Sequence, residues 1–204
     1  MRRLATASLI VAATVVAAPR PGAQTVEGVL ARVNQDEIIT RLDVRQARLL
    51  KLVQVEADTE RAWVDALINR RLMLAEVARY SPPEPAGDAL AARRRQWEAT
   101  LDPGANLADS IGRAGMTDAA VQSWLRDDLR LRAYLDRRFP AVSIAARDDL
   151  LKYYREHEAE FTGNGVLRPF DEVEADVRSR LSATARATAI AAFIAELRRR
   201  ADIR

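Results

Sequence analysis

The sequence predicts a mostly α-helical protein with one small β-hairpin near its start, and three observations lead to this fold class. Apolar residues recur at helical spacing in one segment after another along the 204 residues, and prolines, glycines or capping residues bound these segments. Alternation typical of a strand is convincing only near the N-terminus. A hydrophobic fraction of 49% and a charged fraction of 30% are those of a globular protein with a buried core.

The first 23 residues have the features of an export signal. Arg2 and Arg3 form a basic start, residues 4–18 are apolar or small, and alanines at 17, 18 and 23 offer cleavage positions. We therefore expect a signal peptide over residues 1–23 and one folded domain over residues 24–204. A retained transmembrane anchor is the alternative, although this apolar stretch is shorter than the roughly 20 residues that span a bilayer.

The predicted hairpin occupies residues 26–40. Its first strand alternates apolar residues, residues 34–36 supply turn chemistry, and residues 37–39 resume an extended run. Thr40 then begins a helix, with Asp43 at the matching position of a capping box. Two strands alone are marginally stable in water, so the hairpin needs a further strand or a helix to lie on.

Helices follow for the rest of the chain. Proline stops them at 82, 83, 85 and 140, glycine breaks the chain at 115 and at 163–165, and Thr117 caps the longest middle helix. The last helix carries acidic residues in its first turns and Arg198–Arg200 in its last, as the helix dipole favours. The predicted helices cover residues 41–53, 59–80, 87–101, 107–114, 118–139, 145–160 and about thirty residues from 171.

Composition argues against several functions. The net charge of +3 falls to zero without Arg2, Arg3 and Arg20, and the other arginine runs lie among acidic residues, so we expect no nucleic-acid binding. Cysteine is absent, which leaves no thiol nucleophile, and His157 is the only histidine, so it cannot complete a metal site, and nothing further in the sequence assigns it to a serine triad. We therefore expect neither a catalytic centre nor a metal or other cofactor.

The helix predicted over residues 118–139 has more apolar surface than one stripe. Val121, Leu125 and Leu129 form one row, and further faces carry Trp124, Leu131, Tyr134 and Leu135. Two readings follow: several helices surround this one, or part of its surface lines an open groove that accepts varied apolar partners.

Several segments, in order, resemble the N-terminal domains of the SurA-type periplasmic chaperones, which are shared with PpiD and PrsA-type foldases. Residues 29–40 (VLARVNQDEIIT) are similar to the family's opening hairpin and helix start, and residues 67–74 (LINRRLML) to its second-helix motif. Residues 151–161 (LKYYREHEAEF) resemble the stretch that leads into the isomerase domain. Residues 169–173 (PFDEV) and 197–203 resemble the helix that returns from it.

The resemblance implies a hairpin that is clamped by the C-terminal helix and by a short strand at Asp202-Ile203-Arg204. It also implies a parvulin-type prolyl isomerase domain of about a hundred residues, inserted at an exposed loop. Here Phe161 and Phe170 are only nine positions apart, so residues 162–170 mark a place where that domain is absent. No isomerase residue can be carried over, and we expect no enzyme activity.

The function implied is that of an ATP-independent periplasmic holdase, which binds unfolded or extended apolar segments of envelope and outer-membrane proteins without stable membrane insertion. One alternative is a structural or interaction subunit whose groove is filled by a homodimer mate or a dedicated partner. A second is an isomerase-related protein with residual activity. The candidate client-binding residues, chosen for size and position near helix breaks, are Met73, Trp124, Tyr134, Tyr153, Tyr154, Phe161 and Phe170.

Overall fold

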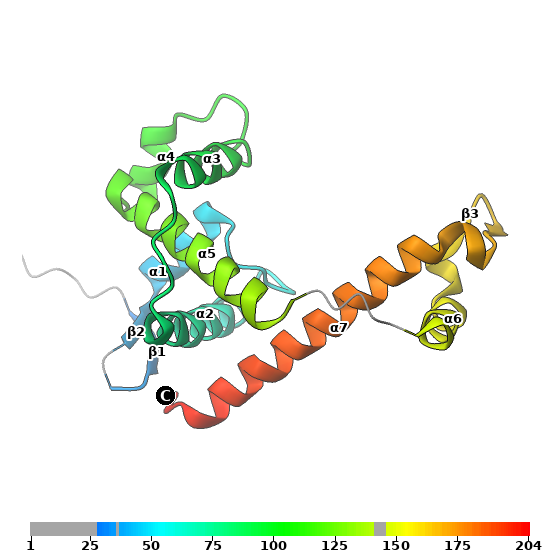
Figure 1. Cartoon of the computed structure of the whole chain (residues 1–204). Coiled ribbons are helices and arrows are strands. Elements are labelled where there is room, and N and C mark those ends of the chain that lie inside the picture. The colour runs from blue at the N-terminus through cyan, green and yellow to red at the C-terminus, as the bar shows by residue number, and fades with distance from the viewer. Residues whose placement is uncertain (1–27, 36, 141–145) are drawn as a thin grey trace, which may run out of the picture.

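The computed structural model describes residues 28–35, 37–140 and 146–204. The predicted signal peptide and the first two residues of the predicted hairpin lie outside the described residues. The described chain is mostly helical, which confirms the predicted fold class (Figure 1). In order it contains β1 (Val29–Val33), β2 (Glu37–Thr40), α1 (Arg41–Leu50), α2 (Glu60–Tyr80), α3 (Gly87–Glu98), α4 (Leu107–Arg113), α5 (Asp118–Arg138), α6 (Arg147–Glu156), the 3₁₀ helix η1 (Glu158–Phe161), β3 (Thr162–Gly163), β4 (Val166–Leu167) and α7 (Phe170–Arg200).

The N-terminal hairpin is completed by the C-terminal residues. β1 pairs antiparallel with β2, and its other edge pairs with residues 202–204. The Arg32 amide donates to the Arg204 carbonyl at 2.7 Å, and the Arg204 amide donates back to the Arg32 carbonyl at 3.0 Å. The Asn34 amide donates to the Asp202 carbonyl at 2.7 Å. This short antiparallel bridge at Ile203 supplies the partner that an isolated hairpin lacks, and the clamp is confirmed.

The C-terminal helix α7 is bound to α2 by hydrogen bonds. Near the end of α7, the Arg198 guanidinium donates to Asn69 Oδ1 at 2.7 Å and to Asp65 Oδ1 at 2.8 Å, both on α2.

At the start of α1, Thr40 Oγ1 accepts from the Asp43 amide while Asp43 Oδ2 accepts from the Thr40 amide. This is the predicted capping box, and it sets the direction in which α1 leaves the hairpin.

Most of the buried apolar residues belong to a body made of β1, β2, α1 to α5 and the C-terminal half of α7. One cluster joins the hairpin, α1, α2, α5 and the end of α7. A second joins the end of α1 to α3, α4 and the start of α5, around the fully buried Trp97 and Leu125. Trp124 packs against both clusters, so α5 is the helix that unites the body.

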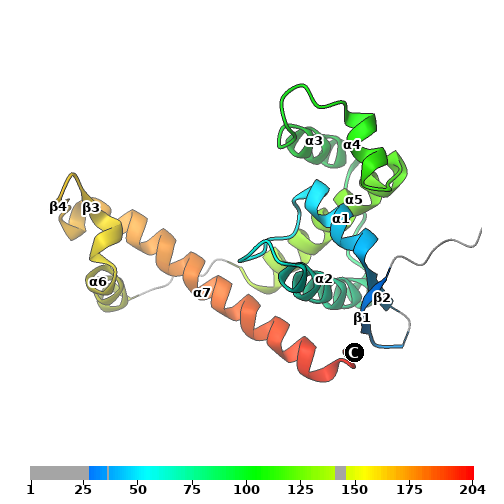
Figure 2. The same ribbon diagram turned by 180° about the vertical axis from the view of Figure 1, so that it is seen from behind.

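A distal lobe lies at the other end of α7 and stands apart from the body in both views (Figures 1 and 2). It consists of α6, η1, β3, β4 and the N-terminal half of α7. Its core is a separate cluster of five buried residues, Leu150, Tyr153, Phe161, Val173 and Val177. Arg147 at the start of α6 forms ion pairs with Asp171 at 2.9 Å and Glu174 at 3.1 Å on α7. One 31-residue helix therefore supplies residues to two distinct cores.

Three helices end three or more residues earlier than predicted. α1 ends at Leu50 because Lys51 adopts a left-handed conformation with φ of 52°. α3 ends at Glu98, and the Thr100 hydroxyl donates a hydrogen bond to the Trp97 carbonyl just beyond it. The helix predicted over residues 145–160 was wrong as one continuous element. It ends at Glu156 because His157 turns back, hydrogen-bonds the Tyr153 carbonyl at 2.9 Å and stacks on the Tyr153 ring.

Gly163 and Gly165 belong to a small β-hairpin in the distal lobe. β3 and β4 form a two-residue hairpin whose turn residues Asn164 and Gly165 have φ of 51° and 78°. Asn-Gly suits such a turn because both central residues need positive φ. The hairpin places Val166, 68% exposed, at the outer end of the distal lobe.

Candidate functional site

An open hollow lies against the middle of α7, where the helix passes from the distal lobe to the body. It has a volume of about 1070 Å³. One face of α7 and a single residue of the α1–α2 loop line it: Ala175, Arg178, Ser179, Ser182, Ala183, Arg186, Ala187, Ile190 and Gln54.

A smaller, more apolar pocket of about 200 Å³ continues this hollow into the body. The two share Gln54, and Ile194 in the pocket is one helical turn beyond Ile190 in the hollow. Its other lining residues are Leu52, Val53, Ala66, Asn69, Arg70, Met73 and Leu131. We call the hollow and the pocket together the α7 groove.

Five of the nine α7 residues that line the groove are alanine or serine. Ala175, Ser179 and Ala183 follow at intervals of four residues, which places them on one face of the helix. The two arginines on this wall are already paired: Arg178 with Glu174 at 2.7 Å, and Arg186 with Asp136 of α5. An incoming chain would therefore meet a shallow surface with few protruding groups.

The inner end of the groove is deeper and contains a buried cation. Arg70 is 5% exposed, its guanidinium lies 4.5 Å from the centre of the Trp124 ring, and its Nη2 donates to the Trp124 carbonyl at 3.3 Å. Burial lowers the pKa of Arg70, and the negative charges of Asp127 and Asp128 oppose that shift. Stacking on an aromatic ring suits a guanidinium with few water contacts.

The buried carboxylate of Asp128, near Arg70, has a structural role because it joins α3 to α5. Asp128 on α5 has a side chain that is 6% exposed, and it accepts from Arg93 of α3 at 2.7 Å and from Arg132 at 2.9 Å. Two arginine partners satisfy a charge that would be costly to bury alone. Among the described residues, no group of three or more histidine, cysteine or acidic side chains is placed to hold a metal ion.

The seven residues predicted to bind clients fall in three different places. Met73 lines the inner end of the α7 groove, and Trp124 packs between the two body clusters. Tyr134 is 8% exposed, with its ring between those of Tyr80 and Phe193, and burial raises the pKa of its hydroxyl. The remaining four, Tyr153, Tyr154, Phe161 and Phe170, lie in the distal lobe.

Those four aromatic residues contact one another inside the distal lobe. Tyr153 and Phe161 are buried, and Tyr154 packs on both Phe161 and Phe170 with ring centres 5.4 Å and 5.6 Å apart. The Tyr154 hydroxyl donates to the Arg168 carbonyl at 2.5 Å. In this conformation they hold α6 and η1 on α7.

The α7 wall was not predicted from the sequence, because the candidate residues were chosen for large side chains. Alanines and serines spaced by four residues indicate a helix face that another backbone can approach, yet such positions score low in a search for large apolar side chains. Leu131 was noted among the additional apolar residues of the helix predicted over residues 118–139, and the structure places it in the groove together with Ile190 of α7.

The chain was compared with protein-family models, with curated proteins and with solved structures, and no match was found in any of the three. The SurA-type resemblance of the motifs therefore stays a prediction. None of the described helices has an apolar stretch of the length that crossing a membrane requires.

Proposed function

We propose that this protein is an ATP-independent holdase of the periplasm that binds extended apolar segments of unfolded envelope proteins in the α7 groove. The observation that carries the proposal is an open concave surface between the body and the distal lobe, with a shallow wall and an apolar inner end. The motif resemblance supports the same function.

The proposed mechanism is weak burial at several points. Each apolar side chain covered in the groove contributes roughly 1.5 to 3 kcal/mol before the cost of ordering the client is subtracted. Met73 can accept side chains of different shape, since its unbranched thioether fills irregular gaps. Binding of this kind tolerates many sequences and needs no nucleotide.

The small α7 wall allows the client backbone to lie close. Alanine and serine side chains keep the approach distance short, and the hydroxyl of Ser179 and the amide of Gln54, both on exposed residues, can hydrogen-bond an extended main chain. Contacts to the main chain do not depend on sequence, which agrees with a broad client range.

The test is suppression of aggregation. An unfolded outer-membrane protein is diluted from urea with a several-fold molar excess of this chain, and light scattering is followed. We expect the wild type to reduce scattering strongly. Ala183→Trp should lose most of this effect because the indole fills the groove, whereas Ala185→Trp should keep it, since Ala185 is equally exposed on α7 but lies outside the groove.

Two results would count against the holdase. Absence of suppression by the wild type is one, and equal behaviour of the two tryptophan variants is the other. A tight dimer that Ala183→Trp dissociates would instead favour the alternative of an interaction subunit whose groove is filled by a second copy.

A further inference from the structure

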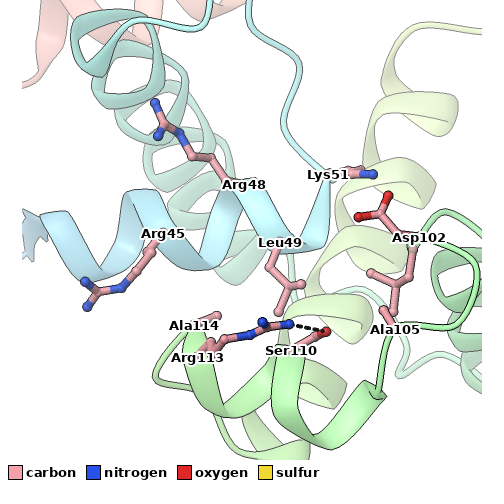
Figure 3. A pocket seen from close by; sticks show the side chains of 10 residues that line it. Arg45, Arg48, Leu49, Lys51, Asp102, Ala105, Ser110, Arg113 and Ala114 are labelled. Carbon is pink, nitrogen blue, oxygen red and sulfur yellow. Dashed lines mark hydrogen bonds between the residues drawn. The ribbon is translucent and has the colours of Figure 1, made fainter.

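A second concave site lies on the body, between the C-terminal part of α1, the α3–α4 loop and α4. Its volume is about 380 Å³, and no residue of the α7 groove lines it. Figure 3 shows the side chains that surround it, and we call it the basic pocket. Its lining residues are Arg45, Arg48, Leu49, Lys51, Leu101, Asp102, Ala105, Ser110, Arg113 and Ala114.

Basic side chains dominate the rim. Four of the ten lining residues are arginine or lysine, and Asp102 is the single acid among them. Arg48 is already paired with Asp58 at 3.0 Å. Lys51 donates to the neutral Thr100 carbonyl at 2.8 Å and Arg113 to the Ser110 hydroxyl at 3.5 Å, and neither forms an ion pair with a described residue.

Lys51 and Arg113 therefore have donors to spare. An ammonium group has three N–H donors and a guanidinium has five, so one bond to a neutral oxygen leaves most of each group available to a carboxylate. The two come from different elements, the C-terminus of α1 and the C-terminal turn of α4. A ligand that reached both would be held from opposite sides of the pocket.

Besides these cations, Asp102 and Ser110, the lining is apolar. Leu49 and Leu101 are partly exposed, and Ala105 and Ala114 complete the wall. A phosphate backbone would make no use of such a surface, whereas a peptide that carries an acidic and an apolar side chain would use both parts. The chemistry of the pocket thus favours an acidic peptide over a nucleic acid.

The pocket is held in shape by contacts on both sides. Gly115, with φ of 67°, lies so close to α1 that an added Cβ would stand 2.7 Å from Leu42 Cδ1, and Gln46 Nε2 reaches the Gly115 carbonyl at 3.4 Å. At the other end, the Lys51 bond to Thr100 fixes the end of α3. A preformed site spends little binding energy on its own ordering.

We propose that the basic pocket docks an acidic segment of a partner protein, with a Glu or Asp carboxylate on Lys51 and Arg113 and a neighbouring apolar side chain over Leu49 and Leu101. This interaction is separate from the proposed holdase function, because it uses different residues and concerns a charged ligand. It gives the body a means of contacting a folded or tethered partner while the α7 groove is occupied.

The test uses fluorescence anisotropy with a labelled, acetylated and amidated peptide rich in Leu and Glu, and a matched peptide with Lys in place of Glu. We expect only the Glu peptide to bind, and the affinity to fall severalfold between about 0.05 M and about 0.3 M salt. The double variant Lys51→Glu with Arg113→Glu should weaken binding about tenfold or more.

The control is Arg95→Glu with Arg137→Glu, which changes the net charge equally at exposed positions of α3 and α5 away from the pocket. It should weaken binding less than about twofold. Arg113→Gln, a neutral change at an exposed residue, should weaken it a few-fold and guards against misfolding of the double variant, which is checked by circular dichroism.

Four results would overturn the proposal. These are equal loss in the control, equal binding of the Lys peptide, tighter binding of a single-stranded oligonucleotide, or a requirement for a free peptide C-terminus. Aggregation assays are not involved, so failure here leaves the holdase test unaffected.

Discussion

The body and the distal lobe are stabilised in different ways. The body has clusters of 14 and 7 buried apolar residues, and the two ends of the described chain meet in its sheet. The lobe has one cluster of five, two of which belong to α7. A core of that size offsets little of the entropy lost when α6 and the small hairpin become ordered. Order in the lobe therefore depends on α7, which is anchored in the body, while the body can fold around its own core.

The first prediction compares how truncating one leucine in each core changes the free energy of unfolding, and it concerns the greatest change. Leu125 and Leu150 are both fully buried, the first in the body and the second in the lobe. Leu125→Ala should lower the free energy of unfolding of the body by about 3 kcal/mol. Leu150→Ala makes the same chemical change but should loosen only α6 and η1, leaving the main unfolding transition nearly unchanged.

Urea unfolding followed by tryptophan fluorescence measures the first effect, since all three tryptophans lie in the body. Amide hydrogen exchange of residues 147–161 measures the second. If Leu150→Ala shifts the body transition as far as Leu125→Ala does, the two regions form one cooperative unit and the comparison fails.

An intermediate effect concerns the closure of the body. Deletion of residues 202–204 removes three backbone hydrogen bonds to β1 and should lower the stability of the body by about 2 to 4 kcal/mol. Ile203→Ala keeps those bonds and serves as the control, so it should cost clearly less. Exchange of the Arg32 amide in β1 and of the Asn34 amide next to it reports the change. Unchanged protection of these two amides in the deletion variant would show that the third strand contributes little.

The smallest predicted change in stability depends on pH and comes from the Arg94–Asp118 ion pair in the body. A hydrogen bond from Arg94 of α3 lowers the pKa of Asp118 at the start of α5, with Arg94 Nη2 2.6 Å from the carboxylate. A carboxylate whose pKa is depressed on folding adds stability above its unfolded pKa of about 3.9, and this stability is lost as the pH falls through the folded pKa.

Asp118→Asn should therefore be slightly less stable than the wild type near about pH 7, and the two should converge in acid. Urea midpoints across that range measure the difference, and exchange in α6 should stay the same. A constant gap at all pH values would assign the effect to helix capping instead of to the Arg94 pair.

Local signals were sufficient for most of the secondary structure. The Thr40 capping box, the prolines after α2 and the acidic start of α7 were readable because each acts through residues within one turn. The pairing of residues 202–204 with β1 joins the two ends of the chain, and it was expected from the family resemblance and from the hairpin's need for a partner. The Asn164–Gly165 turn was readable in principle, since Asn-Gly is a strong hairpin signal, but only the glycines were weighed.

The sites were harder to predict because they depend on how helices lie relative to one another. Tyr134, Tyr153 and Phe161 are large and near helix breaks, yet neighbouring helices bury them. Five residues of the α7 wall are alanines and serines, which matter only because they line an open hollow. The basic pocket exists because Gly115 lets α4 approach α1, and periodicity in one helix carries no information about such an approach.

The pairing of β1 with residues 202–204 also bears on when this protein can fold. Asn34 and Asp202 are 168 positions apart, so on the ribosome the hairpin emerges long before the strand that completes its sheet. Contacts of such long sequence separation are slow to form. The body can therefore reach its final stability only after synthesis has passed the last turn of α7, and a nascent chain that stalls earlier exposes a sheet edge open to wrong partners.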